Sequence, residues 1–247
     1  MNKIFANMKM KASPKPFRVI ADAPGGSKGQ ANVPQSPISD VIFDYGDVLL
    51  RLDYRPCLEG HFPESLVSEL CNARNTNGAD DSLGFFEAES RMDCGEPSVS
   101  VIKEYKKNYG SNLAQAFRYY IDHYEDSISG IIDGMEALLV DLNNAGYGVW
   151  GLTNWSQETF HVVFEKFPQL EPLLQGTVVS GIEKMHKPNA DIFNLALNRF
   201  NLNAAQTVFF DDTQANVDGA KAIGINGIRF NNATQARDEL QRLGVKI

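Results

Sequence analysis

The sequence is poor in cysteine and histidine, with three cysteines and four histidines among its 247 residues. Cys57, Cys71 and Cys94 are odd in number and match no zinc-binding spacing, which favours reduced thiols over a disulfide framework. The four histidines are scattered along the chain, and their spacing indicates no metal cluster. Because free thiols are typical of reducing compartments, we expect a cytoplasmic protein.

The sequence also lacks a long hydrophobic run and an excess of positive charge. No stretch approaches the roughly 18 apolar residues of a membrane-spanning helix, and the first residues lack the apolar core of a secretory signal. Lysine and arginine total 23 against 31 aspartates and glutamates, giving a formal net charge of -8. We therefore expect no binding to nucleic acid or to an anionic membrane. An anionic small molecule can still bind where a site supplies local positive charge.

Residues 1–37 differ from the rest of the chain in composition. They carry six basic residues and one acidic residue, are rich in proline, glycine and serine, and show no lasting hydrophobic periodicity. This composition predicts a disordered basic arm, with a targeting segment as the alternative.

Short apolar runs and helical patterns alternate through most of the remaining chain. This alternation predicts an α/β fold: a Rossmann-like parallel sheet core with helices on both faces. Residues 56–128 read as helical with no convincing strand, so we expect a helical insert between core segments 38–55 and 129–247. Strands are predicted at 41–45, 147–153, 177–179, 207–210 and 227–230, and helices at 135–144, 157–167, 190–200, 217–223 and 233–243.

Polar residues stand at the ends of three predicted strands. Asp44, Thr153 with Asn154, and Asp211 with Asp212 follow such strands, and Lys187 precedes the proline that opens a helix. Ligands of open parallel sheets bind at the carboxyl ends of the strands. Each residue alone has an ordinary structural explanation, as a helix cap, a β-branched strand residue or a solvated charge. Their combination in this order predicts one shared site.

These stretches resemble the haloacid dehalogenase-like hydrolase superfamily, in Val41-Ile42-Phe43-Asp44, Gly151-Leu152-Thr153-Asn154, Lys187-Pro188 and Val208-Phe209-Phe210-Asp211-Asp212. The resemblance covers residues 40 to about 230. From Gly146 onward it is similar to the subgroup that includes the phosphatase acting on α-D-glucose 1-phosphate. It implies a phosphatase acting on a small phosphate ester, with sugar phosphates favoured, and a cap domain formed by the helical insert.

The resemblance also implies the roles of the site residues. Asp44 would attack phosphorus and form an aspartyl-phosphate. Mg²⁺ would be held by the Asp44 side chain, the Gly46 carbonyl and Asp212, with Asp211 close by. Thr153 and the Asn154 backbone N–H would hold phosphate oxygens, Lys187 would bridge Asp44 and the phosphate, and Asn216 would orient Asp212.

One position departs from the family pattern. Most members carry an aspartate two residues after the nucleophile, and its side chain serves as acid and base. Here that position is Gly46, so a cap residue or the substrate must supply the proton. Asp47 is expected to act as a turn residue that points away. A hexose 1-phosphate, with its better leaving group, suits such a site.

Several questions stay open at the level of sequence. The alternatives are a metal-independent dehalogenase and a non-catalytic binding protein on the same fold, and either a monomer or a homodimer is compatible. Trp155 and His186 are candidates to border the pocket. The cap residues that we consider for specificity are Asp53, Tyr54, Arg55, Phe86, Glu87, Glu89 and Arg91.

Overall fold

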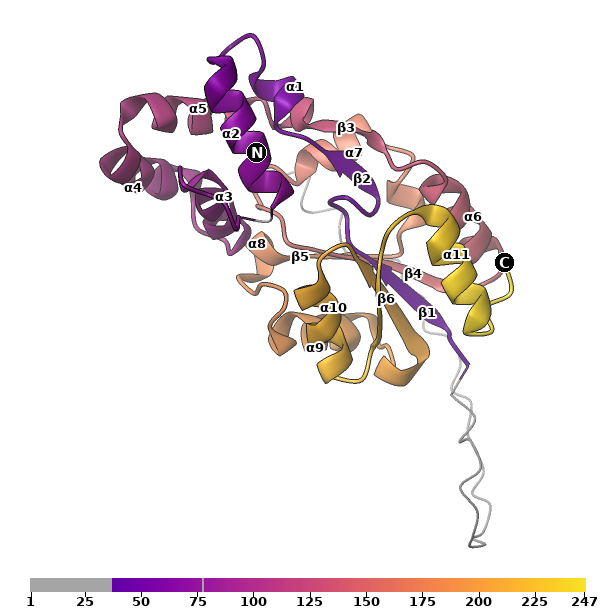
Figure 1. Ribbon diagram of the computed structural model, residues 1–247. Coiled ribbons are helices and arrows are strands. Elements are labelled where there is room, and N and C mark those ends of the chain that lie inside the picture. The colour runs from indigo at the N-terminus through magenta and orange to yellow at the C-terminus, as the bar shows by residue number, and fades with distance from the viewer. Residues whose placement is uncertain (1–36, 77) are drawn as a thin grey trace, which may run out of the picture. The chain divides into compact units, whose positions relative to one another are not determined.

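The computed structural model describes residues 37–76 and 78–247. The predicted basic arm therefore lies outside the described residues, except for Pro37 at its end. Figure 1 shows the described part as a central sheet with helices on both sides and a helical region beyond one end of the strands. Within the described ranges, no helix has the length and apolar character needed to cross a membrane.

The central sheet is parallel throughout its described strands. Its order is β5–β4–β1–β6–β7. The middle strand β1 pairs with β4 on one side and with β6 on the other, with Phe43 level with both Gly151 and Phe210. The parallel α/β fold is thus confirmed. The strands are β1 (Asp40–Phe43), β4 (Gly148–Thr153), β5 (Thr177–Val179), β6 (Thr207–Asp211) and β7 (Asn226–Arg229).

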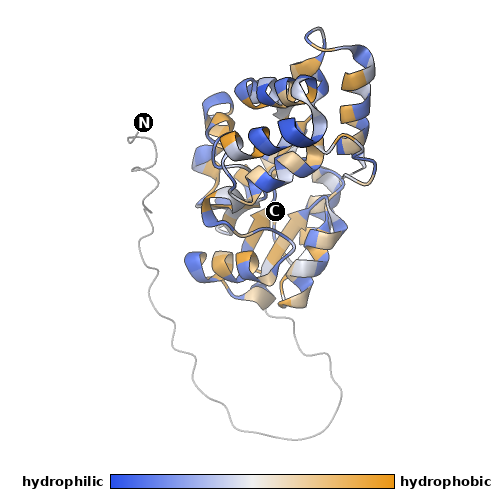
Figure 2. Ribbon diagram, turned by 90° about the vertical axis from the view of Figure 1, so that its left-hand side faces the viewer, coloured by the Kyte–Doolittle hydropathy of each residue, from blue (hydrophilic) through white to orange (hydrophobic). Residues whose placement is uncertain are grey.

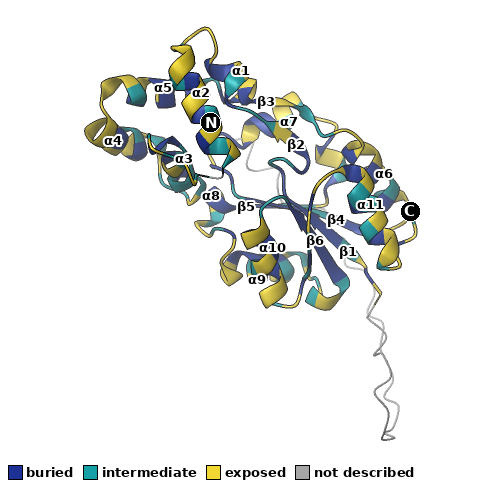
Figure 3. Cartoon of the chain, in the orientation of Figure 1, coloured by how far each residue is buried: buried dark blue, intermediate teal, exposed yellow. Residues whose placement is uncertain are grey.

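Alternate residues of β1 enter two separate hydrophobic clusters. Val41 and Phe43 pack in the cluster that contains the apolar residues of α6 (Met135–Asn144) and α11 (Ala233–Arg242). Ile42 packs in the cluster formed with α9 (Ala190–Phe200) and α10 (Gln214–Ala222). Both faces of the sheet are therefore covered, as parallel sheets require. Figures 2 and 3 show the sheet strands as apolar and buried.

Local sequence signals explain several helix boundaries. The Asn232 side chain accepts a hydrogen bond from the Gln235 N–H at 2.9 Å and caps the start of α11. Helix α9 ends at Asn201, whose φ of 55° is left-handed, a conformation that asparagine tolerates. The helix predicted at 157–167 is shorter than expected, because α7 spans only His161–Lys166.

Residues 53–127 are inserted between two strands that the sequence did not reveal. Strands β2 (Leu50–Leu52) and β3 (Ile128–Ile131) form an antiparallel pair. With three and four residues, they are too short for an alternating pattern to stand out, and β3 begins inside the range expected to lack strands. The insert contains α1 (Arg55–Leu58), α2 (Glu64–Asn75), α3 (Phe85–Asp93), α4 (Ser98–Tyr109), α5 (Ser111–Asp122) and a 3₁₀ turn at Tyr124–Ser127.

The insert has an aromatic interior. Phe85 makes edge-on contacts with Tyr54 and Phe117, with ring centroids 5.4 and 5.0 Å apart. Tyr120 joins the same group, 5.0 Å from Tyr54. This packing fixes the helices that face the strand ends of the core.

The remaining short elements belong to the core. They are α8 (Ser180–Glu183), which the sequence did not predict, and 3₁₀ turns at Glu171–Leu173 and Ala204–Gln206.

Candidate active site

Asp44 is held at the carboxyl end of the central strand. Its backbone N–H donates to the Phe210 carbonyl at 3.0 Å, which continues the pairing of β1 with β6. Its Oδ1 accepts from the Tyr45 N–H at 2.7 Å and lies 2.9 Å from Lys187 Nζ. Among the described residues, no hydrogen bond falls on Oδ2. This oxygen is therefore available to a ligand.

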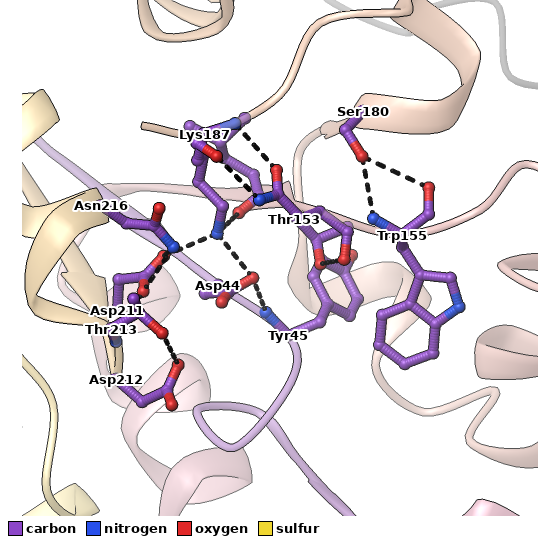
Figure 4. A network of polar contacts seen from close by, with 12 residues as sticks. Asp44, Tyr45, Thr153, Trp155, Ser180, Lys187, Asp211, Asp212, Thr213 and Asn216 are labelled. Carbon is purple, nitrogen blue, oxygen red and sulfur yellow. Dashed lines mark hydrogen bonds and ion pairs between the residues drawn. The ribbon is translucent and has the colours of Figure 1, made fainter. Parts of the chain in front are cut away.

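Lys187 is fully buried and joins two carboxylates. Its Nζ lies 2.9 Å from Asp44 Oδ1 and 2.6 Å from Asp211 Oδ2, and it donates to the Leu152 carbonyl at 3.1 Å (Figure 4). Burial acts to lower the pKa of Lys187, but the charges of Asp211 and Asp44 overcome it and raise the pKa above the usual value. The side chain thus stays cationic although it is buried.

Asp211 is fixed in place more tightly than Asp212. Its Oδ1 accepts from the Thr213 N–H at 2.9 Å, and both carboxylate oxygens accept from Asn216 Nδ2 at 3.0 and 3.1 Å. Asp212 is half-buried, and among the described residues its side chain accepts a single, long hydrogen bond of 3.4 Å from the Thr213 hydroxyl. The expectation that Asn216 orients Asp212 was wrong. The Asn216 amide donates instead to Asp211, whose side chain is fully buried.

Three carboxylates converge on one point. Asp44, Asp211 and Asp212 each offer an oxygen, and these oxygens lie within 4.8 Å of one another. Burial, followed by the charges of Asp211 and Asp47, raises the pKa of Asp212 to about 6. Burial and the neighbouring aspartates also raise the pKa of Asp44, against the opposing effect of Lys187. One lysine does not balance three acids, so the donor set suits a hard divalent cation.

The site opens into a pocket of about 320 Å³. Its floor holds Asp44, Gly46, Asn154, Lys187 and Asp212, while Thr153 and Asp211 are buried and do not line it. The opposite wall comes mainly from the helical insert and is rich in aromatic rings. Its residues are Tyr54, Arg74, Phe86, Glu89, Ser90, Asp93, Tyr120 and Tyr124, with Trp155 from the core beside them.

The Asn154 side chain has a structural role that the sequence did not suggest. Its Oδ1 accepts from the Lys187 N–H at 2.9 Å, and its Nδ2 donates to the Lys187 carbonyl at 3.1 Å. The same Nδ2 lies 3.2 Å from His186 Nδ1. The side chain therefore ties the loop after β4 to the backbone that carries Lys187.

The match to known proteins is extensive. Residues 86–230, more than half of the chain, match the sequence model of the haloacid dehalogenase-like hydrolases. The chain belongs to this family. Solved structures share its fold: a predicted haloacid dehalogenase-like hydrolase from Porphyromonas gingivalis aligns over 86% of this chain and 100% of its own, with 20% identity and a TM-score of 0.64. An enzyme of the family from Bacteroides thetaiotaomicron, solved with magnesium and inorganic phosphate, aligns over 78% of this chain and 93% of its own, with 20% identity and a TM-score of 0.58.

Two proteins that are similar in sequence to this chain are named for an enzymatic activity. A sesquiterpene phosphatase from Aspergillus oryzae is 31% identical over 109 residues, which is 44% of this chain and 55% of the relative. A chloroplast flavin mononucleotide hydrolase from Arabidopsis thaliana is 24% identical over 166 residues, 63% of this chain and 66% of the relative. The chain thus spans between about half and two thirds of the length of these relatives. Neither name refers to a sugar phosphate.

The pocket separates the candidate specificity residues of this hydrolase into two groups. Asp53, Tyr54, Phe86 and Glu89 line it, and so do Trp155 and His186. The other three candidates lie elsewhere. Arg55 pairs with Glu64, Arg91 pairs with Glu96 and Glu104, and Glu87 is exposed.

Asp47 has a left-handed φ of 52°, as a turn residue would, but it does not point away from the site. It pairs with Arg74 at 2.6 Å and lines the pocket.

Four pocket residues carried no signal in the sequence. Arg74 on α2 and Asp93 on α3 lie far apart along the chain and belong to no motif. Tyr120 and Tyr124 read as part of an amphipathic helix. The hydroxyls of Tyr54 and Tyr120 both donate to the buried Glu89 carboxylate, and burial raises the pKa of Glu89. Only the packing of the inserted helices brings this group over the strand ends.

Proposed function

We propose that this protein is a Mg²⁺-dependent phosphatase that hydrolyses a small phosphorylated metabolite through an aspartyl-phosphate on Asp44. The observation that carries the proposal is the Lys187 bridge, which places a buried cation between the nucleophile Asp44 and Asp211 at the pocket between the strand ends and the helical insert. A lysine at this place favours attack by a carboxylate on a dianion, because it offsets repulsion between them.

The donor set fits magnesium. Asp44 and Asp212, with the Gly46 carbonyl and with Asp211 close by, would supply the oxygen ligands that this ion prefers. The raised pKa of Asp212 agrees with this, because burial and then the charges of Asp211 and Asp47 disfavour its ionised form when no cation is bound. When bound, Mg²⁺ would offset the charge of the carboxylates and of the phosphate. The related enzyme from Bacteroides thetaiotaomicron was solved with magnesium and inorganic phosphate.

Side chains of the protein would perform the attack on phosphorus, the binding of the phosphate and the orientation of the nucleophile. Asp44 Oδ2 would attack phosphorus, since Oδ1 is held by the Tyr45 amide and by Lys187. The Asn154 N–H would bind a phosphate oxygen at the end of β4, and the Thr153 hydroxyl remains the proposed second donor, although its side chain is buried and does not line the pocket. Lys187 would hold Asp44 in its reactive orientation. In-line phosphoryl transfer depends mainly on such positioning and charge stabilisation.

The choice of substrate belongs to the same proposal. Sugar phosphates are our first class, since Gly46 supplies no acid and a hexose 1-phosphate has a good leaving group. Four aromatic side chains line the pocket and suit phosphate esters that carry an apolar or aromatic group, which form our second class of substrate. They are Tyr54, Phe86, Tyr120 and Tyr124. A cytoplasmic monomer or homodimer acting on these compounds completes the proposal.

A panel assay tests this function. Phosphate release is measured for sugar phosphates, nucleotides, flavin mononucleotide and prenyl phosphates, with and without Mg²⁺, with the Asp44→Asn variant as the blank. We expect metal-dependent turnover of at least one class and none in the variant. Turnover that persists in EDTA would contradict the metal requirement and favour the dehalogenase-type alternative. Absence of turnover from a folded protein that binds Mg²⁺ would favour a binding role.

A further inference from the structure

The proposed reaction needs a residue that gives a proton to the leaving group and later takes one from water, and none has been assigned so far. A leaving alkoxide needs a proton as its bond to phosphorus breaks, and the water that later attacks must lose one. Gly46 has no side chain to serve either step. We propose that Asp93, at the end of α3 in the helical insert, is the general acid and base of this site. This inference rests on the function proposed above.

The position of Asp93 is fixed relative to the core, although it belongs to the insert. Its backbone carbonyl accepts from the Ser180 hydroxyl at 2.6 Å, and Ser180 Oγ accepts from the Trp155 N–H at 2.9 Å. One buried hydroxyl thus ties the end of α3 to the loop that follows Thr153 and Asn154. Asp93 also lines the pocket that contains Asp44.

A close backbone approach supports the same docking. Gly95 follows α3 with a φ of 91°, and a Cβ on it would lie 2.8 Å from the Gly181 carbonyl. Such a position admits only glycine without a shift of the backbone. The end of α3 therefore packs directly against α8 (Figure 1). This contact allows a side chain of the insert to be positioned as precisely as one of the core.

The surroundings of Asp93 favour its protonated form, which is the form that a proton donor needs. Burial and then the charge of Glu89 raise its pKa well above the usual value, while the Ser156 backbone amide opposes this. Asp44 raises the pKa further and Lys187 lowers it. Asp93 also interacts electrostatically with Tyr124, whose pKa is raised by burial, by Glu89 and by Asp93. A neutral Asp93 also avoids repelling a phosphate dianion.

The other acidic groups of the pocket are already engaged. Glu89 accepts from two tyrosine hydroxyls, and Asp47 pairs with Arg74 at 2.6 Å. Asp53 Oδ1 accepts from the Arg55 N–H at 2.9 Å, and Asp44 and Asp212 are the proposed metal ligands. His186 is held by Asn154 through Nδ1, and burial lowers its pKa, so it is neutral and a weak acid. Asp93 is the pocket carboxyl of the insert whose side chain has no side-chain partner among the described residues.

The chemical balance is as follows. As Asp44 Oδ2 bonds to phosphorus and the ester P–O bond breaks, the Asp93 carboxyl passes its proton to the leaving oxygen, and the alcohol departs. The Asp93 carboxylate then takes a proton from a water whose oxygen attacks phosphorus. The bond between phosphorus and Asp44 breaks, inorganic phosphate leaves, and both aspartates return to their starting states.

The decisive experiment compares leaving groups in the Asp93→Asn variant. Rapid-mixing kinetics is run with p-nitrophenyl phosphate, whose phenolate leaves without a proton, and with an alkyl phosphate that the wild type hydrolyses. We expect the aryl ester to give a stoichiometric burst of nitrophenolate followed by slow turnover, because the phosphorylated Asp44 then waits for a base. The alkyl ester should give no burst and a rate lowered by about 10²–10⁴-fold.

Matched variants separate this role from a structural one. Glu87→Gln removes an exposed carboxylate from the same helix and should leave both substrates unchanged. Asp93→Glu retains the carboxyl and should recover part of the alkyl phosphate activity. Equal slowing of both substrates without a burst, or the burst pattern in Glu89→Gln instead, would overturn the proposal for Asp93. Failure of the wild type to turn over either ester would contradict the proposed function itself.

Discussion

Replacing Lys187 by methionine should destabilise the protein and abolish its activity together. Lys187 is fully buried, and its ammonium group lies 2.9 Å from Asp44 and 2.6 Å from Asp211. Methionine retains most of the volume but leaves two buried carboxylates without their cation. Removing one partner of a buried ion pair typically costs about 3–5 kcal/mol of stability, and we expect a loss of this size at pH 7.

The pH and metal dependence of that loss identifies its cause. Removing the lysine charge, which lowers the pKa of Asp44 in the wild type, should raise the folded-state pKa of Asp44 further, so the variant should regain stability as the pH falls and Asp44 becomes protonated. Mg²⁺ should recover part of the loss at pH 7, since it supplies positive charge at the same carboxylates. Urea unfolding at pH 5 and pH 7, with and without Mg²⁺, measures both effects.

An exposed lysine provides the control. Lys103→Met on α4 makes the same substitution at the surface and should change the stability by less than about 0.5 kcal/mol. A Lys187→Met variant as stable as this control at pH 7, or one whose deficit does not depend on pH, would refute the electrostatic explanation.

Further predictions concern the metal, the helix ends and the arm. Because the pKa of Asp212 is raised to about 6, protons should compete with Mg²⁺ as the pH falls below 6, and calorimetry at pH 5 and 7 should show weaker binding at pH 5; equal affinities would contradict this. Asn232→Ala should cost about 1 kcal/mol through loss of the cap on α11, seen as a lower urea midpoint. Gly84→Ala should lower the free energy of unfolding by about 1–2 kcal/mol. Gly84 has a left-handed backbone with a φ of 64°, and a Cβ there would clash with the Tyr109 side chain. An unchanged melting temperature of the variant would argue against this prediction. Deleting residues 1–37 should leave phosphate release unchanged, and a large loss would assign the arm a structural role.

The core of this fold could be predicted well from the sequence. The strand Thr177–Val179 is a short buried apolar run, and helices α6 and α9 have clear apolar periodicity, so their predicted bounds agree with the structure. The convergence of Asp44, Asn154 and Asp212 on one pocket could be predicted for a related reason. A parallel sheet places the ends of β1, β4 and β6 side by side, whatever lies between them in the sequence.

The parts that could not be predicted depend on packing between distant segments. Strands β2 and β3 are stabilised by each other and are too short to show a pattern alone. The pairing of Asp47 with Arg74 and the contact of Asn216 with Asp211 depend on side-chain directions that spacing does not fix. The approach of Asp93 to the loop after β4 depends on the docking of α3 on α8, which has no local signature.

The central claim is the covalent role of Asp44, and trapping the intermediate tests it most directly. The enzyme is mixed with Mg²⁺ and its best substrate, quenched in acid within the first turnover, digested, and examined by peptide mass spectrometry. We predict a phosphoryl group on Asp44 in the wild type and none in the folded Asp44→Asn variant. Turnover by the wild type with no phosphorylated peptide, or with the phosphoryl group on another residue, would contradict the account.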